Sequence, residues 1–80
     1  MKISQKAIRE AARESKRICA RNGYGHQVLL WADGSTSESV SDSDLTCLLH
    51  DDGTRTYPVL RIRRPMTRAE VRREVETRAS

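Results

Sequence analysis

The longest apolar run of the chain is Val28-Leu29-Leu30-Trp31-Ala32, which lies within residues 26–32, HQVLLWA. A run this short predicts a strand. The next pair, Asp33-Gly34, indicates a two-residue hairpin turn, because such turns need positive φ at both central positions. Residues 35–40, STSESV, are almost wholly polar and fit either an edge strand or a serine-rich loop.

A second hairpin follows from residues 45–63. Leu45 to His50 fits a strand, Asp51-Asp52-Gly53 fits a three-residue turn, and residues 55–63 fit the return strand. A short helix capped by Ser43 and closed by Gly53 is the alternative for residues 43–53. We favour the strand, because the return strand is rich in apolar residues. Pro58 cannot donate to a ladder and predicts a free edge there.

Helices are expected at both ends. Residues 4–21 carry apolar or small side chains at helical spacing, with Ser4 as N-cap and Asn22-Gly23 as the stop. The second helix should start at residue 68. Thr67 and Glu70 fit a capping box, and Met66 and Val71 are spaced as a hydrophobic staple.

These elements predict one α+β domain over residues 1–80: an N-terminal helix, a three- to four-stranded antiparallel sheet and a C-terminal helix. Both helices should cover one sheet face, toward which Val28, Leu30, Leu60 and Ile62 would point. The opposite face would then be open for docking or dimerisation and would carry Leu29, Trp31, Tyr57, Val59, Arg61 and Arg63.

Charge is divided into three blocks. The net charge is +5 over residues 1–21, −6 over residues 22–54 and +5 over residues 55–80, giving +4 in all. Basic ends therefore flank an acidic middle. Glutamates interleave with the arginines, so helix pairs such as Glu10 with Arg13, Glu14 with Arg17, Glu70 with Arg73 and Glu74 with Arg78 are an alternative use of this charge.

Several function classes are not expected. The sequence has no signal peptide and no membrane-spanning run, and it has only two cysteines, so we expect a cytoplasmic protein with reduced thiols. No nucleophile motif, phosphate loop or cofactor motif is present, so no enzyme is expected. The residues of zinc-binding type do not match a zinc-finger spacing, so we expect no metal; they are Cys19, His26, Cys47 and His50.

We therefore expect a small non-enzymatic interaction protein that binds a protein or nucleoprotein and forms a homodimer if the sheet face is open. The alternative is a nucleic-acid-binding module, since arginines neutralise phosphates and the isoelectric point is near 9.6. The residues expected to bind the partner are Arg9, Arg13, Lys16, Arg17, Trp31, Tyr57, Arg61, Arg63, Arg68, Arg72 and Arg73.

Two resemblances bear on these hypotheses. The order helix, three strands, helix, with Arg68, Arg72 and Arg73 at the start of the last helix, is similar to that of the double-stranded RNA-binding domain. In that family the last helix presents basic residues to phosphates. The similarity covers the order of elements and not the family's lysine cluster. By size and lack of motifs, the chain also resembles accessory proteins of phages and mobile elements, anti-CRISPR proteins among them, which block host protein or nucleoprotein surfaces.

Overall fold

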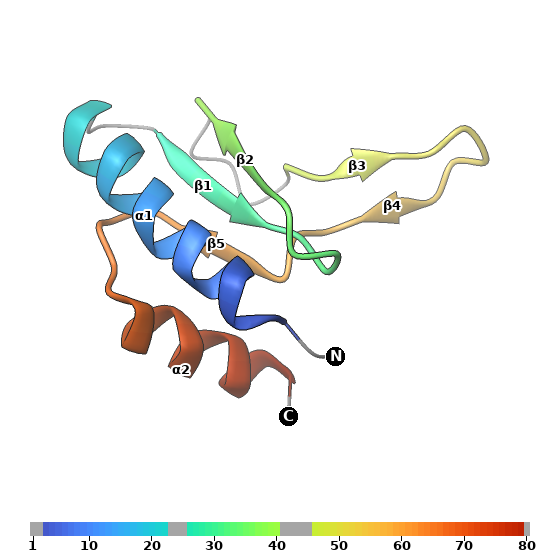
Figure 1. The fold of residues 1–80 in the computed structure, drawn as a ribbon. Helices are drawn as coiled ribbons and strands as arrows, with labels where there is room; N and C mark the ends of the chain where they lie inside the picture. Colours follow the sequence, from blue (N-terminus) through green and yellow to red (C-terminus); the bar gives the residue numbers. More distant parts are fainter. Residues whose placement is uncertain (1–2, 23–25, 41–45, 80) are drawn as a thin grey trace.

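The computed structural model describes residues 3–22, 26–40 and 46–79, and these residues form two helices and five short strands (Figure 1). The elements are α1 (Gln5–Asn22), β1 (Gln27–Leu30), β2 (Thr36–Ser39), β3 (Leu48–Leu49), β4 (Arg55–Thr56), β5 (Leu60–Ile62) and α2 (Arg68–Ala79). The predicted α+β class and the order of helices and strands are confirmed. No helix in these three described ranges is long and apolar enough to cross a membrane.

The strands form two antiparallel sheets. The larger has the order β2-β1-β5, so β1 is the central strand, with Leu29 between Ser37 and Arg61. The predicted polar edge strand is therefore present as β2. The smaller sheet pairs β3 with β4, Leu48 with Thr56 and Leu49 with Arg55. Residues 43–45 lie outside the described residues, and the strand predicted up to His50 is confirmed only as β3.

The prediction of one continuous strand over residues 55–63 is wrong. The chain is divided into β4 and β5, with Pro58 between them. Proline has no N–H to give to a ladder and interrupts regular pairing. After the break, the Val59 N–H donates to the Leu30 carbonyl at 2.7 Å and the chain joins the larger sheet. Residues 46–57, which we call the arm, project away from the rest of the molecule (Figure 1).

The two-residue Asp33-Gly34 turn is also wrong. The Gly34 N–H donates to the Trp31 carbonyl and the Trp31 N–H to the Ser35 carbonyl, each at 2.9 Å, so Ala32, Asp33 and Gly34 form a three-residue loop. Only Gly34 has positive φ, at 89°, whereas a two-residue turn would require it of Asp33 as well. Asp33 instead accepts the Ser35 N–H on Oδ1 at 2.9 Å.

The predicted three-residue turn at Asp51-Asp52-Gly53 is confirmed, and it repeats the first turn in detail. The Gly53 N–H donates to the His50 carbonyl at 2.9 Å, and φ of Gly53 is 87°. Oδ1 of Asp52 accepts the Thr54 N–H at 3.0 Å, as Asp33 does with Ser35. The sequence pattern Asp-Gly-Ser/Thr therefore builds both hairpin ends.

Both predicted N-caps are present. The Ser4 hydroxyl accepts the Ala7 N–H at 3.1 Å. At α2, the Thr67 N–H donates to Glu70 Oε1 at 3.1 Å and the Glu70 N–H donates to Thr67 Oγ1 at 3.2 Å, which is the reciprocal capping box.

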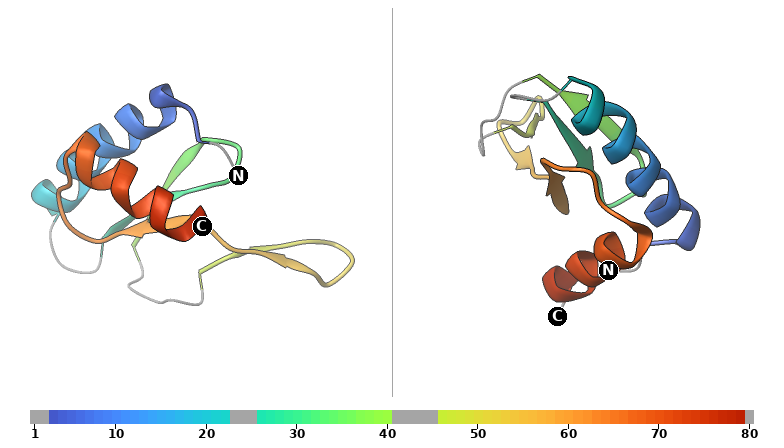
Figure 2. Two further views of the ribbon diagram at one scale, coloured as in Figure 1. Left: turned by 90° about the horizontal axis from the view of Figure 1, so that it is seen from below. Right: turned by 90° about the vertical axis from the view of Figure 1, so that its left-hand side faces the viewer.

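One hydrophobic core lies between the two helices and the larger sheet. Val28, Leu30, Leu60 and Ile62 point into it as predicted, and both helices cover the same sheet face (Figure 2). The prediction that Leu29 lies on an open face is wrong, because its side chain is only 3% exposed. The remaining core side chains come from the helices and the segment before α2: Ala7, Ile8, Ala11, Ala12, Ile18, Cys19, Met66, Val71 and Val75.

A buried hydroxyl fixes α1 against the segment that leads into α2. Ser15 is fully buried; its Oγ accepts the Met66 N–H at 2.9 Å and lies 2.7 Å from the Ala12 carbonyl, to which it donates. The Ser15–Met66 contact holds the start of α2 beside the second half of α1, so the two helices run antiparallel (Figure 1).

Replacing Ser15 with alanine should destabilise the fold by about 1–3 kcal/mol, because a buried N–H of Met66 loses its acceptor. Urea unfolding followed by circular dichroism would measure this loss. The exposed neighbour Lys16→Ala is the control, expected to change stability by less than about 0.5 kcal/mol. Equal effects of the two substitutions would contradict the assigned role of Ser15.

Alanine at Gly34 should cost more stability than alanine at Gly53. Both glycines have positive φ, which costs an L-residue roughly 1–2 kcal/mol. A Cβ at Gly34 would also lie 3.3 Å from the Ala7 Cβ, whereas a Cβ at Gly53 meets nothing within 4 Å. Thermal melts of the two variants test this order, and a lower melting temperature for Gly53→Ala would contradict it.

Candidate functional site

Four cationic side chains lie on the adjoining flanks of α1 and α2. Arg9 follows Gln5 by four residues and Lys16 follows it by eleven, and these spacings place all three on one side of α1. The Arg72 Nη2 donates to Gln5 Oε1 at 2.5 Å, so this side of α1 faces α2. Arg68 precedes Arg72 by one helical turn. We name Arg9, Lys16, Arg68 and Arg72 the basic seam.

The basic seam contains no internal carboxylate pair. All four side chains are exposed, and within the described residues none is bonded to a carboxylate. Three of the neighbouring glutamates lie on other flanks. Glu10 and Glu14 lie on the other flank of α1, and Glu70 lies on the far flank of α2. Glu76 follows Arg72 by one helical turn and lies on the same flank of α2, where the series of cations ends.

Two of the predicted binding arginines are paired on the surface instead. Arg13 lies 3.1 Å from Glu10, and Arg17 lies 2.6 Å from Glu14, as the alternative reading of the helix charges predicted. Glu14 raises the pKa of Arg17 through this hydrogen bond and its charge. The expected pair of Glu70 with Arg73 is replaced by Glu70 with Arg64 at 2.8 Å. Arg73 is exposed on the outer side of α2.

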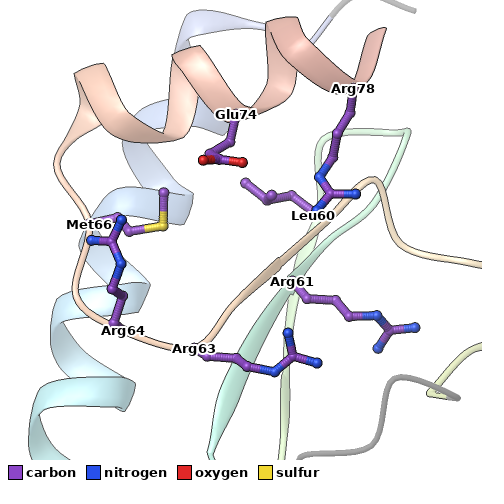
Figure 3. Close-up of a pocket in the computed structure, with 7 residues that line it drawn as sticks. All are labelled: Leu60, Arg61, Arg63, Arg64, Met66, Glu74 and Arg78. Carbon is purple, nitrogen blue, oxygen red and sulfur yellow. The ribbon is translucent and has the colours of Figure 1, made fainter.

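A second basic site lies between β5 and the other flank of α2. It is a cavity of about 260 Å³, which we name the arginine hollow (Figure 3). Arg61 and Arg63 come from β5 and the residue after it, while Glu74 and Arg78 come from α2. Arg61 is partly used inside the fold, because its Nη2 donates to the Thr46 carbonyl at 2.7 Å. The lining residues are Leu60, Arg61, Arg63, Arg64, Met66, Glu74 and Arg78.

The predicted aromatic sheet face is divided between two places. Trp31 is half-buried and donates its Nε1–H to Ser37 Oγ at 2.9 Å. It lines an apolar hollow of about 400 Å³ together with Leu48, His50 and Thr56 of the arm. Tyr57 is 53% exposed and is the last residue of the arm, at the end that joins the larger sheet, so it does not share a flat face with Trp31.

The zinc-type residues do not converge. The Cys19 Sγ lies 3.5 Å from the Ile62 carbonyl, and burial raises the pKa of its thiol. His26 Nδ1 lies 3.2 Å from Glu38 Oε2, and His50 Nε2 lies 2.6 Å from Thr56 Oγ1. Over residues 3–22, 26–40 and 46–79, no three His, Cys, Asp or Glu side chains gather as metal ligands.

The eleven predicted binding residues therefore fall into separate groups. Arg9, Lys16, Arg68 and Arg72 come together in the basic seam, while Arg61 and Arg63 line the arginine hollow. Two arginines of the hollow, Arg64 and Arg78, were not predicted. Arg78 follows the buried Val71 and Val75 at spacings of seven and three residues, so its place beside the core was readable from the sequence.

Comparison with known proteins identifies no relative: no family model, no curated protein and no solved structure matches this chain. The similarity to the double-stranded RNA-binding domain accordingly gains no support. In the part of the chain that the structure describes, five strands rather than three lie between the helices.

Glu70 should titrate far below an ordinary glutamate. The Thr67 N–H and then the Arg64 guanidinium lower its pKa from 4.5 to about 2. Because the folded pKa is depressed, the stability it contributes is present above pH 4.5 and is lost as the pH falls toward 2. Carboxyl chemical shifts measured by NMR would report this pKa. A value near 4.5 would contradict the capping-box geometry, and Glu70→Gln should flatten the unfolding profile in this pH window.

Proposed function

We propose that this chain is a non-enzymatic interaction protein that docks its helical face on a nucleoprotein, with the basic seam contacting the phosphate backbone. The observation that carries the proposal is the seam itself. Four exposed cations lie on the adjoining flanks of two helices, and none of them is bonded to a carboxylate among the described residues.

Phosphate chemistry suits this arrangement. Arg9 and Lys16 are about 10 Å apart along the axis of α1, and Arg68 and Arg72 about 6 Å apart along α2. Cations spread in this way can follow a charged backbone, and the affinity comes largely from counterions that the nucleic acid releases. An isolated small anion would meet only one or two of them.

Part of the acidic middle of the chain lies away from this docking face. Asp33 and Asp52 lie in the two hairpin turns, where hydrogen bonds from Ser35 and Thr54 lower the pKa of each carboxyl. Asp52 belongs to the arm, which extends from the sheet and not from the helical face (Figure 1). Asp52 is therefore carried away from the basic seam, whereas the turn that holds Asp33 lies close to α1, since a Cβ at Gly34 would be 3.3 Å from the Ala7 Cβ.

The mechanism we propose is steric: the bound protein covers a nucleoprotein surface and blocks access to it. The chain offers a folded face with concentrated charge, which is what such blocking needs. An inhibitor or accessory protein of a phage or mobile element is the kind of protein that this mechanism fits, and a cytoplasmic place of action goes with the same proposal.

Binding to nucleic acid should weaken steeply as salt is raised. Four phosphate contacts give a slope of log affinity against log salt of about −3.6 on duplex DNA and about −2.8 on single strands. Fluorescence anisotropy with labelled duplex and single-stranded oligonucleotides would measure these slopes. The variant Arg9→Gln/Arg68→Gln should reduce the duplex slope by about two.

Arg13→Gln/Arg17→Gln is the matched control, because these two arginines are paired with Glu10 and Glu14. It removes the same charge and should change the slope much less. If the two double variants had equal effects, binding would depend on net charge alone and the basic seam would not be the binding site. No binding at low salt would reject phosphate contact and leave an acidic protein surface as the partner.

A further inference from the structure

The apolar hollow lies on the sheet face away from the helices, where the first hairpin meets the arm. Trp31 follows Leu29 by two residues and Ser37 pairs with Leu29 across the ladder, so both side chains point away from the core. The arm adds Leu48 and Thr56, which pair with each other. The volume of this hollow, about 400 Å³, is in the range of sites that hold small molecules.

The walls of the apolar hollow offer a ligand little hydrogen bonding. The single hydrogen-bonding group of the Trp31 indole, its Nε1–H, is already used on Ser37 Oγ at 2.9 Å. His50 and Thr56 are bonded to each other, Nε2 to Oγ1, at 2.6 Å. Leu48 is 51% exposed and adds apolar surface that the fold leaves uncovered. What these walls provide is therefore the π surface of an indole and aliphatic carbon.

One charged group, Asp33, lines the apolar hollow, and the described lining contains no lysine or arginine. The Ser35 hydroxyl and N–H donate to Asp33 Oδ1 at 2.6 and 2.9 Å. These hydrogen bonds lower the pKa of Asp33, so its carboxyl is ionised at neutral pH. Both donors are neutral, and no cation among the described residues is bonded to Asp33. The negative charge is therefore available to a ligand.

We propose that the apolar hollow binds a small organic cation, in which an ammonium group is carried on an apolar or aromatic body. The positive group lies between Trp31 and the carboxylate of Asp33, and the apolar body lies against Leu48. A cation is attracted to the face of an indole by the quadrupole of the ring. An anion would be repelled by Asp33, and a neutral molecule would gain only the apolar contacts.

This binding is independent of the proposed docking on a nucleoprotein. The apolar hollow and the basic seam lie on opposite sides of the larger sheet, because the helices cover the face toward which Val28 and Leu30 point. The two sites also differ in charge. Either site can therefore fail its test without affecting the other.

The indole N–H of Trp31 provides a direct readout, because Trp31 is the only tryptophan of the chain and gives one indole signal in an NMR spectrum. Titrations with benzyltrimethylammonium, benzyl alcohol and benzenesulfonate compare a cation, a neutral molecule and an anion that share one ring. The cation should shift the Trp31 signal with a dissociation constant on the order of a millimolar. The alcohol and the sulfonate should bind more weakly by about fivefold or more.

The charge is tested by Asp33→Asn, which removes it and keeps an oxygen that can accept the Ser35 N–H. Binding of benzyltrimethylammonium should weaken by about fivefold, while binding of benzyl alcohol should be unchanged. Asp52→Asn is the matched control. Asp52 accepts the Thr54 N–H in the same way in the other turn, and it does not line the apolar hollow. This control should leave the affinity for the cation as it is.

The apolar wall is tested by Leu48→Ser, which should weaken binding of the cation and of benzyl alcohol alike, by about threefold or more. Leu49→Ser is the control, because Leu49 is 67% exposed and points to the opposite face of the arm. Both leucines are exposed, so both variants should fold, and circular dichroism checks this.

The proposal is overturned if the Trp31 signal does not move at a cation concentration about tenfold above the expected dissociation constant. Equal binding of the cation, the alcohol and the sulfonate would also overturn it, because the hollow would then not recognise charge. Equal effects of Asp33→Asn and Asp52→Asn would place the charge effect outside the hollow. A lysine-containing peptide that binds more tightly than the small cation, with the same dependence on Asp33 and Leu48, would replace the small molecule with a protein side chain as the occupant.

Discussion

The buried contact of Ser15 with the backbone of Met66 is the constraint on which the arrangement of the helices depends. The sheet provides the face, but three short strands would allow a helix to cross them in several ways. A hydroxyl placed at one point of α1 fixes where the chain must enter α2. Because Ser15 is fully buried, any displacement would leave an unpaired N–H in the core. The antiparallel arrangement of the helix pair follows from this contact.

Acidic and basic side chains lie mostly on different flanks of the two helices. On α1, the glutamates occupy the side away from α2 and pair there with Arg13 and Arg17. On α2, Glu70 is held at the capping box beside Arg64, on the side facing the arginine hollow. The adjoining flanks of the two helices are left with cations of both elements. A helical surface that looks mixed in the sequence is therefore segregated in space, because residues three or four apart share a flank and neighbours in sequence do not.

Local chemistry was largely predictable. Ser4 and the Thr67–Glu70 box bounded the helices, because a cap needs only residues within one turn. Alternation predicted the four inward strand residues Val28, Leu30, Leu60 and Ile62. The wrong predictions concern segments whose local sequence is compatible with two different structures. Asp-Gly fits a two-residue or a three-residue turn, and Asp33 adopted the one that lets its carboxylate bind Ser35. Residues 55–63 fit one strand, yet Pro58 allowed the chain to leave one sheet and join another.

By itself, the sequence determined the α+β class, the helix ends, the core-facing residues and the block pattern of charge, because each depends on spacing within a few residues. Tertiary structure alone decided which cations gather. Arg9 and Arg68 are far apart in the chain and lie on adjoining helix flanks only because α1 packs against α2. Arg61 and Arg78 share a hollow only because β5 lies beside α2. Contacts between distant segments depend on how faces pack together, and no spacing rule within a single element contains that information.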